Sequence, residues 1–461
     1  MKKLSVYILF ATIIMTGCKK SYDDTINGQK PDDRIAAALA AYQSKLTKAP
    51  YGWIMLESTT GTAFNQGVSQ DGPVAAFSYY MEFTDSSKVS MFSDFDTSMA
   101  VTPKISDYRI KSLQRPALIF DTYSYIHVPC DPDPDISKSP FGVGYGWGTD
   151  FEFSFADSVD PSKLGDTIKL TGNLNSANAV LVKATKAQHD AYYAGGLKAT
   201  MVAWGSILNY FKRVTAGSTQ FEMTPGLGGA KSVDINSLDA TGNLKSVNSS
   251  VFFTATSVNL VTPAVIGTQT VNRFDNIVWN AGTSTISTNI NGTTAATITG
   301  STSPLKNDLN APRTWWNKAV NAGEYWVTLN NFHINGVDDA LNVASIPNYA
   351  GFTIFWPRFG TSGGVNYDLL SPITFTSTGG VTIAFGAAYR PPTFTGTGTV
   401  VFPLYGTLGT VPPAAATVFA NLRTKFAEPA GYYLILKEDN LTYDMVNVAD
   451  AKSWVNWIWV F

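Results

Sequence analysis

The stretch FDTYSYIHVPCDPDPD, residues 120–135, gathers side chains that could bind a metal ion or act as nucleophiles. Its candidate ligands are His127, Cys130, Asp131, Asp133 and Asp135. Calcium prefers clustered oxygen ligands, which the three alternating aspartates could supply. Zinc requires more His or Cys side chains than this stretch offers. Calcium at Asp131, Asp133 and Asp135 is therefore the metal hypothesis, and no other cofactor is expected.

The spacing of the same stretch argues against a calcium loop of the EF-hand type. Such a loop carries Gly at its sixth position and Glu at its twelfth. Counted from Asp131, this chain has Ile136 and Gly142 there, and two prolines interleave the aspartates. We therefore interpret residues 125–128 as a strand that runs into a stiff acidic loop.

Two further patterns could indicate catalysis. GTSGG at 360–364 resembles a nucleophile elbow at Ser362, but that motif needs a following helix and a later histidine. The last histidine is His333, which precedes the motif. Paired carboxylates could instead form a glycoside hydrolase, with Asp121, Asp150 and Glu152 as candidates by proximity in the sequence. The sequence predicts no catalytic residue and favours a protein that is not an enzyme.

Aromatic residues in loops or at the ends of elements are the stronger signal for binding. Aromatic faces offer flat, rigid contact area to sugars or protein partners. The candidates are Tyr145, Trp147, Trp315, Trp316 and Trp356. Trp315 and Trp316 are adjacent on an expected helix, so at least one is expected to face outward. Trp53, Trp457 and Trp459 are expected in the core.

The elements that must position these residues are mostly strands. The chain has 461 residues, with 44% hydrophobic, 13% aromatic and only 15% charged residues. Short alternating segments separated by turns recur throughout, which is typical of antiparallel sheets. Helices are expected from Asp32 to about residue 48, over 186–212 with a break at Gly195-Gly196, and over 414–427. The formal charge of −2, without a basic block, argues against nucleic-acid binding.

We predict a mainly β (α+β) fold, with two barrel- or sandwich-like domains and a few packed helices. Residues 1–17, MKKLSVYILFATIIMTG, have the charged start and short apolar core of an export signal. The segment Met15-Thr16-Gly17-Cys18 resembles a bacterial lipobox, with Cys18 as the lipidated residue. A polar tether is expected over 18–30. The two domains are expected over 31–213 and 214–461.

The order of motifs resembles a family of uncharacterised Bacteroidetes lipoproteins, a domain of unknown function (number 4302). The match rests on the lipobox, on Ala49–Trp53 and on the segments 106–135, 150–155, 165–173 and 181–185. It extends over about 31–195. The resemblance implies an outer-membrane location near SusC- and SusD-type uptake proteins, and it implies no site residue.

From these observations we expect a non-catalytic lipoprotein that is anchored in the outer membrane, with the cell surface favoured over the periplasmic face. Its expected role is to bind a glycan or another nutrient as an accessory to an uptake system. A structural or assembly partner of an outer-membrane complex is the first alternative. A carboxylate-based glycoside hydrolase is the second.

Overall fold

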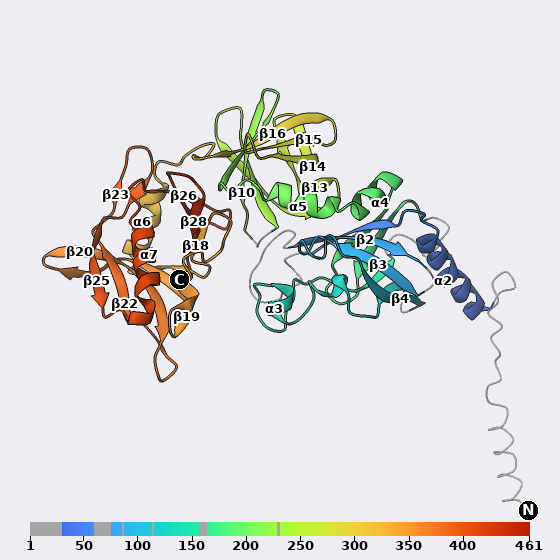
Figure 1. Ribbon diagram of the computed structural model, residues 1–461, viewed down its shortest axis with the longest axis horizontal. Coiled ribbons are helices and arrows are strands. Elements are labelled where there is room, and N and C mark those ends of the chain that lie inside the picture. The colour runs from blue at the N-terminus through green and yellow to red at the C-terminus, as the bar shows by residue number, and fades with distance from the viewer. Residues whose placement is uncertain (1–29, 60–74, 85–86, 113–114, 156–163, 228–230) are drawn as a thin grey trace, which may run out of the picture.

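Three β-rich units follow one another along the chain (Figure 1). The computed structural model describes residues 30–59, 75–84, 87–112, 115–155, 164–227 and 231–461. The expected signal segment, Cys18 and the tether up to residue 29 lie outside the described residues. None of the helices in the described segments is long and apolar enough to cross a bilayer.

The first unit, barrel 1, is a closed barrel of eight strands that pair in sequence order. Its strands are β1 (Trp53–Ser58), β2 (Ala76–Phe83), β3 (Lys88–Ser93), β4 (Lys104–Ser112), β5 (Pro116–Phe120), β6 (Glu152–Phe155), β7 (Thr167–Gly172) and β8 (Asn178–Lys183). In β7 every second residue is buried, so Ile168 and Leu170 fill the interior. Helix α2 (Pro31–Thr47) adds Tyr42 and Leu46 to the same core.

Between β5 and β6 the chain forms a long loop with two short helices, η2 (Tyr125–His127) and α3 (Pro134–Ser137). The expected strand at 125–128 is therefore wrong. The Ser124 N–H donates to His127 Nδ1 at 3.1 Å, and the His127 N–H donates to Ser124 O at 3.0 Å, and this local hydrogen bonding favours a turn over an extended strand.

The second unit, barrel 2, is also a closed barrel of eight strands that pair in sequence order. Its strands are β9 (Phe211–Ala216), β10 (Thr219–Pro225), β11 (Ser232–Leu238), β12 (Leu244–Phe253), β13 (Ser257–Ile266), β14 (Gln269–Asn280), β15 (Thr285–Ile290) and β16 (Thr294–Ser301). The expected helical segment is split into α4 (Lys186–Tyr193) and α5 (Gly196–Trp204). Gly195 adopts a φ of 80° at the break, a conformation that glycine reaches without strain.

The third unit, the C-terminal sheet, is a 12-stranded sheet that curves around two helices. Its strands are β17 (Trp326–Thr328), β18 (Phe332–Ile334), β19 (Tyr349–Ser362), β20 (Val365–Phe375), β21 (Val381–Thr382), β22 (Phe385–Tyr389), β23 (Thr393–Phe394), β24 (Val400–Val401), β25 (Leu404–Gly409), β26 (Tyr432–Leu436), β27 (Thr442–Asn447) and β28 (Ser453–Ile458). Its helices are α6 (Ala311–Ala322), η4 (Val343–Ser345), η5 (Pro413–Ala415) and α7 (Ala416–Phe426). Helices α6 and α7 share one apolar core with one face of the sheet.

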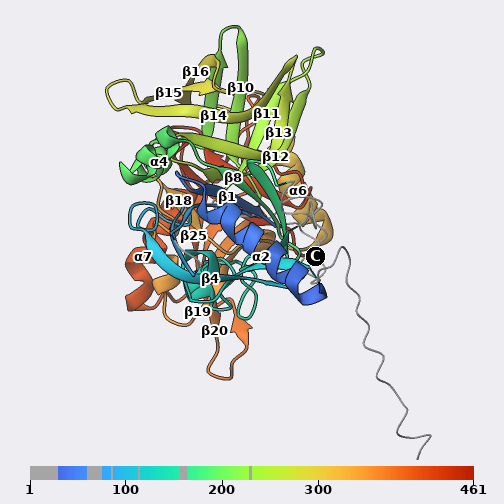
Figure 2. The same cartoon turned by 90° about the vertical axis from the view of Figure 1, so that its right-hand side faces the viewer.

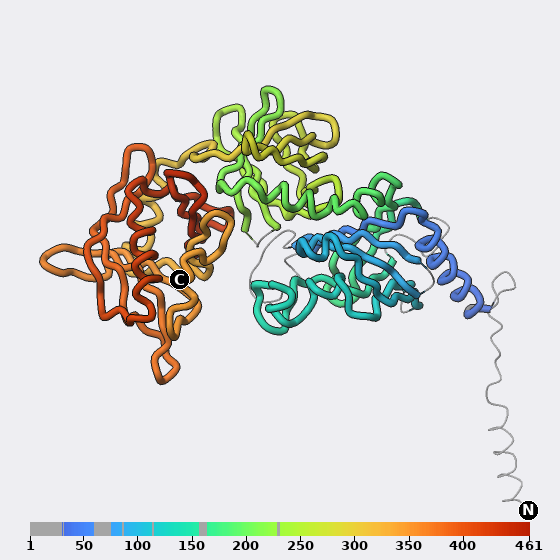
Figure 3. Tube along the Cα trace, viewed as in Figure 1, coloured from blue at the N-terminus to red at the C-terminus, as the bar shows by residue number. Residues whose placement is uncertain are grey.

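The predicted mainly β fold is confirmed, with two closed barrels and a further sheet. The expected boundary at 213/214 falls inside β9, and the range 214–461 holds most of barrel 2 as well as the C-terminal sheet. The tube in Figure 3 follows this path from the blue N-terminal unit through the green one to the red one.

Buried contacts join the three units. Barrel 2 shares one apolar cluster with α4, α5 and the outer side of barrel 1, on which it lies in Figure 2. Across the same junction Lys231 Nζ is 2.7 Å from the fully buried Asp94 carboxylate. Barrel 2 meets the C-terminal sheet at Lys437, whose Nζ is 2.5 Å from Asp234 on β11 and 3.5 Å from Asp444 on β27.

Candidate binding surface

An unbroken series of six aromatic rings crosses the C-terminal sheet, and we call it the aromatic row. Its members in spatial order are Phe461, Tyr325, Trp356, Phe359, Tyr367 and Tyr405. Successive ring centroids are 4.7, 5.0, 5.3, 6.1 and 6.4 Å apart. Phe461 is 54% exposed and the other five rings are half-buried. The row is thus a continuous surface whose rings each touch the next.

Strand alternation places the row on the face of the sheet that α6 and α7 leave uncovered. Trp326 and Phe355 pair across β17 and β19, and both point into the core against the helices. Their neighbours Tyr325 and Trp356 must therefore point to the opposite face. Tyr367 lies on the same side, because the adjacent Asp368 is directed toward Trp316 of α6.

A bulge in β19 brings Phe359 into the row. The pairing of β19 with β20 shifts register between Trp356 and Gly360, and Arg358 adopts a φ of 52° there. The buried Asp368 carboxylate holds this bulge, because it accepts the Arg358 N–H at 2.8 Å and the Trp316 Nε1–H at 2.8 Å. Burial raises the pKa of Asp368 to about 6, although both hydrogen bonds oppose that shift.

Glycines make room for two of the row's three tyrosines, Tyr367 and Tyr405. A Cβ on Gly360 would lie 2.7 Å from Tyr367 Oη, so the ring rests directly on the glycine backbone. Gly363 and Gly364, with φ of 56° and 77°, form the two-residue turn between β19 and β20. Tyr405 Oη donates to Ser362 O at 3.0 Å beside that turn. The GTSGG segment is therefore a hairpin turn that supports the row.

Apolar side chains form the floor next to the row. Val327, Ile354 and Ile373 are at most 7% exposed and pack with Tyr325 and Trp356. This floor excludes water from one side of the rings and fixes their positions, which reduces the entropy lost when a ligand binds.

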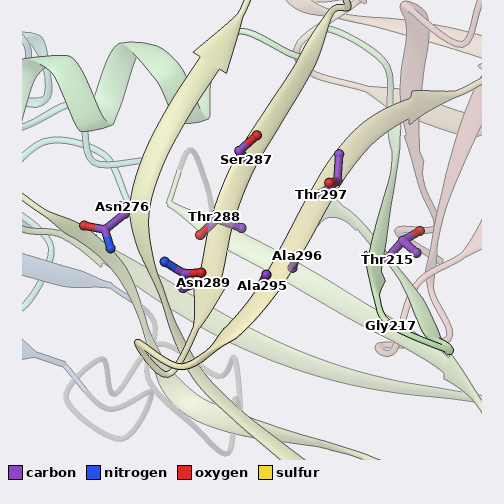
Figure 4. Close-up of a pocket in the computed structure, with 9 residues that line it drawn as sticks. All are labelled: Thr215, Gly217, Asn276, Ser287, Thr288, Asn289, Ala295, Ala296 and Thr297. Carbon is purple, nitrogen blue, oxygen red and sulfur yellow. The ribbon is translucent and has the colours of Figure 1, made fainter.

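Barrel 2 carries a hollow that differs from the aromatic row (Figure 4). This hollow has a volume of about 490 Å³. It is lined by Thr215, Gly217, Asn276, Ser287, Thr288, Asn289, Ala295, Ala296 and Thr297. Ser287 and Asn289 face outward, because Ile286 and Ile290 on the same strand point into the core. Its lining has no aromatic, charged or nucleophilic cluster, so it offers a ligand only neutral hydrogen bonds.

The expectation that Trp315 or Trp316 faces outward is wrong. Trp315 is fully buried and stacks on Phe355 with centroids 5.1 Å apart. Trp316 is 7% exposed and donates to Asp368. Helix α6 is covered by the curved sheet on the side that carries both residues, so adjacent tryptophans can both be buried.

Tyr145 and Trp147, which were both expected to bind a ligand, lie in different environments. Tyr145 is 41% exposed. Trp147 packs against the core of barrel 1, where its ring meets Phe77 edge-on and its Nε1–H donates to Ser137 O at 2.7 Å. Trp147 therefore fixes the loop between β5 and β6 rather than offering a free face to a ligand.

The aspartates of the same loop bind backbone amides. Asp131 accepts the N–H of Asp133 at 2.9 Å, and Asp133 accepts the N–H of Asp135 at 2.8 Å at the start of α3. Tyr123 Oη also donates to Asp131, at 2.5 Å. Across the part of the chain that the structure describes, no three His, Cys, Asp or Glu side chains gather as metal ligands. The calcium hypothesis at Asp131, Asp133 and Asp135 thus has no assembled site.

His127 and Cys130 have structural surroundings. The Ser124 N–H approaches His127 Nδ1 at 3.1 Å, so Nε2 carries the proton and donates to Phe120 O at 3.2 Å. Burial lowers the pKa of His127. Burial also raises the pKa of the Cys130 thiol to about 12, which keeps it protonated and unreactive at neutral pH.

The three candidate carboxylates do not form an acid–base pair. Asp121 is paired with Arg109 at 2.6 Å. The buried Asp150 accepts the backbone N–H groups of Leu174, Asn175 and Ala177, and so holds the turn between β7 and β8. Glu152 faces outward, because Phe153 on the same strand points into barrel 1.

The sequence identified one member of the row, Trp356, and missed the other five. Tyr325, Phe359, Tyr367, Tyr405 and Phe461 come from separate strands and from the end of the chain. The alternation YWVTLN at 325–330 signals that Tyr325 and Trp326 face opposite sides. Strand order, which brings β17, β19, β20 and β25 into one sheet, is not visible in that alternation.

Comparison with known proteins adds a family but no activity. No curated protein matches the chain. Among solved structures, the DNA polymerase III subunit beta from Pseudomonas aeruginosa is 10% identical and is matched over 93% of this chain and 98% of its own. The TM-score is 0.15, which supports no inference about fold. The description "Domain of unknown function (DUF4302)" matches residues 23–281. The chain belongs to this family of unknown function.

Proposed function

We propose that this protein is a non-catalytic lipoprotein of the outer membrane that binds a glycan along the aromatic row. The observation that carries the proposal is the continuous contact of six half-buried or exposed rings on one open sheet face. Sugar rings have apolar faces of C–H groups that pack on aromatic faces, while their hydroxyl groups stay in water.

The shape of the row favours an elongated ligand. The rings follow one another from Phe461 to Tyr405 across β17, β19, β20 and β25, and do not surround a pocket. A chain of several sugar units can contact several rings at once, whereas a monosaccharide would cover only one or two. We therefore infer an oligosaccharide or polysaccharide as the ligand class.

The location rests on the N-terminal sequence. The lipobox-like segment that ends at Cys18 would attach the protein to a membrane, and Lys19 lacks the acidic character that signals retention in the inner membrane. Attachment at the cell surface would let the row meet extracellular glycans. The protein would then serve as an accessory to SusC- and SusD-type uptake proteins.

A glycan array on the soluble body from Ser21 onward tests the binding role. We expect selective binding of linear glycans, and Trp356→Ala to weaken it by about tenfold, which corresponds to roughly 1.4 kcal/mol. Tyr145→Ala is the matched aromatic control, because Tyr145 is exposed on barrel 1 and outside the row. Removal of calcium by a chelator should leave binding unchanged.

Three outcomes would contradict this proposal. A blank array would remove the glycan role. Equal binding by Trp356→Ala and wild type would remove the row as the site. A loss confined to Tyr145→Ala would move the site to the loop of barrel 1.

A protein partner is the second candidate, and one observation favours it. Tyr, Trp and Arg are the residue types that dominate binding energy at protein interfaces, and four of the six rings of the row belong to Tyr or Trp. A photo-crosslinking residue at position 356 of the membrane-anchored protein would trap such a partner. Crosslinks to one outer-membrane protein that persist with excess glycan would favour assembly over glycan binding.

A further inference from the structure

The end of the aromatic row at Tyr405 carries a positive charge. The Arg390 guanidinium carbon is 4.7 Å from the centroid of the Tyr405 ring. Arg390 is exposed, and the described residues include no carboxylate that forms an ion pair with it. A stacked arginine without a carboxylate partner keeps its charge available to a ligand.

Hydrogen bonds fix both partners of this stack. The backbone N–H of Arg390 donates to Pro403 O at 2.8 Å, next to the strand that bears Tyr405. The Tyr405 hydroxyl donates to Ser362 O at 3.0 Å. The guanidinium group carries its N–H donors in a planar fork. This geometry matches a planar carboxylate, which can accept two parallel N–H bonds.

We propose that the ligand of the row is an acidic oligosaccharide, and that Arg390 binds a uronate carboxylate while the rings bind the neighbouring sugar units. This inference rests on the proposed glycan role and adds the charge of the ligand.

Two other arginines of the C-terminal unit, Arg358 and Arg423, interact with residues outside the row. The Arg358 guanidinium lies 5.2 Å from the ring centroid of Trp316, on the side that faces α6. Arg423 of α7 donates from Nη1 to Thr407 Oγ1 at 3.0 Å. Substitution of Arg423 is therefore a matched control, because it removes the same charge from the same unit without touching the row.

Isothermal titration with three linear hexasaccharides tests the proposal. Hexagalacturonate and a mannuronate hexamer are the acidic probes, and cellohexaose is the neutral one. We expect at least one acidic probe to bind more tightly than cellohexaose, and its affinity to fall as salt rises. Arg390→Gln should weaken acidic binding about five- to tenfold, the loss of a charge-assisted pair at an exposed site, and leave cellohexaose unchanged. Arg423→Gln should leave all three affinities unchanged.

The outcomes separate this inference from the glycan role. If cellohexaose binds as tightly as the acidic probes, or if Arg390→Gln has no effect, the acidic ligand is wrong while the glycan role stands. A sulfated galactan hexamer that binds more tightly than both uronates would show that Arg390 selects sulfate, which overturns the uronate assignment. If no hexasaccharide binds and Trp356→Ala changes nothing, both proposals fail.

Discussion

Glu222 lies where barrel 2 meets the segment that leads to the C-terminal sheet. Its carboxylate is 3% exposed, and it accepts a hydrogen bond from Arg213 at 3.1 Å and another from the Leu305 N–H at 2.8 Å. Burial raises its pKa to about 7 from an ordinary value of 4.5, and the Arg213 charge and the Leu305 amide only partly offset this. One residue thus makes the attachment of the linking segment sensitive to pH.

The raised pKa predicts that stability falls as pH rises. The folded state binds the Glu222 proton more tightly than the unfolded state, so this contribution is complete below pH 4.5 and is lost as pH passes about 7. The expected loss is up to about 3 kcal/mol in the free energy of unfolding. Urea denaturation between pH 4 and 8 measures it, and Glu222→Gln should flatten the profile. A Glu222→Gln profile parallel to the wild type would contradict this account.

At the scale of single residues, prediction from the sequence succeeded where neighbouring residues in the chain decide whether a side chain is buried. Trp53 and Trp457 were expected in the core, and both are at most 1% exposed. Trp315 and Trp316 were misread, because an adjacent pair on a helix reveals nothing of a sheet that curves around it. Asp150 was a candidate for a carboxylate pair only by its proximity in the sequence, and it accepts the N–H of Leu174, 24 residues later.

At the scale of elements, the β19–β20 hairpin determines the middle of the aromatic row. Its bulge supplies Phe359, and its glycines supply room for the tyrosine rings. A second glycine of the same sheet, Gly386, is equally close to a neighbour, but there a Cβ would lie 2.7 Å from Leu369 Cδ1 and 2.9 Å from Leu370 O. Substitutions at these two glycines should therefore affect different properties, ligand binding at Gly360 and stability at Gly386.

We predict that Gly360→Ala impairs binding and that Gly386→Ala impairs folding. The three heavy atoms nearest the new methyl group at 360 all belong to the Tyr367 side chain, which can swing away from the row at a cost below about 1 kcal/mol. At 386 it meets backbone in a packed core, where overpacking costs about 1–3 kcal/mol. Thermal denaturation and glycan titration of both variants test the contrast. Equal loss of stability in the two would show that Tyr367 is part of the core.

Elements with strong periodicity were predictable, and one with local capping was not. The alternation in TIKL at 167–170 and the apolar spacing of the first helix were confirmed as β7 and α2. Residues 125–128 alternate in the same way, but they form η2. The His127 ring accepts the Ser124 N–H and the Ser124 carbonyl accepts the His127 N–H, so both backbone donors are satisfied locally and the extended form has no advantage.

At the scale of the whole molecule, the family match and the aromatic row occupy different parts of the chain. The match ends at residue 281, within barrel 2, whereas every residue of the row lies at or beyond 325. The match thus covers barrel 1 and most of barrel 2. The C-terminal sheet carries the surface that we propose for binding, so a relative that lacks this sheet would not bind by the same surface.

Buried charges lie at the junctions between the three units. Lys437 is 2% exposed and connects barrel 2 to the C-terminal sheet through Asp234 and Asp444. Its Nζ also donates to Pro225 O, and Tyr210 Oη donates to Asp444 at 2.6 Å. A buried lysine between two carboxylates compensates charges that neither unit could bury alone.

Lys437→Met should therefore uncouple the C-terminal sheet from the barrels. Methionine fills similar space but leaves two buried carboxylates without a cation, at a cost of about 3–5 kcal/mol. Calorimetry should show one transition for the wild type and an earlier, separate transition for the C-terminal sheet in the variant.

Lys425→Met is the control. Lys425 pairs only with the partly exposed Glu428 at 3.6 Å, so this substitution should cost below about 1 kcal/mol. Adding Asp234→Asn and Asp444→Asn to Lys437→Met should restore part of the lost stability, because the unpaired charges are then gone. A single transition at the wild-type temperature in Lys437→Met would show that apolar contacts alone join the units, through Tyr210 and Val446.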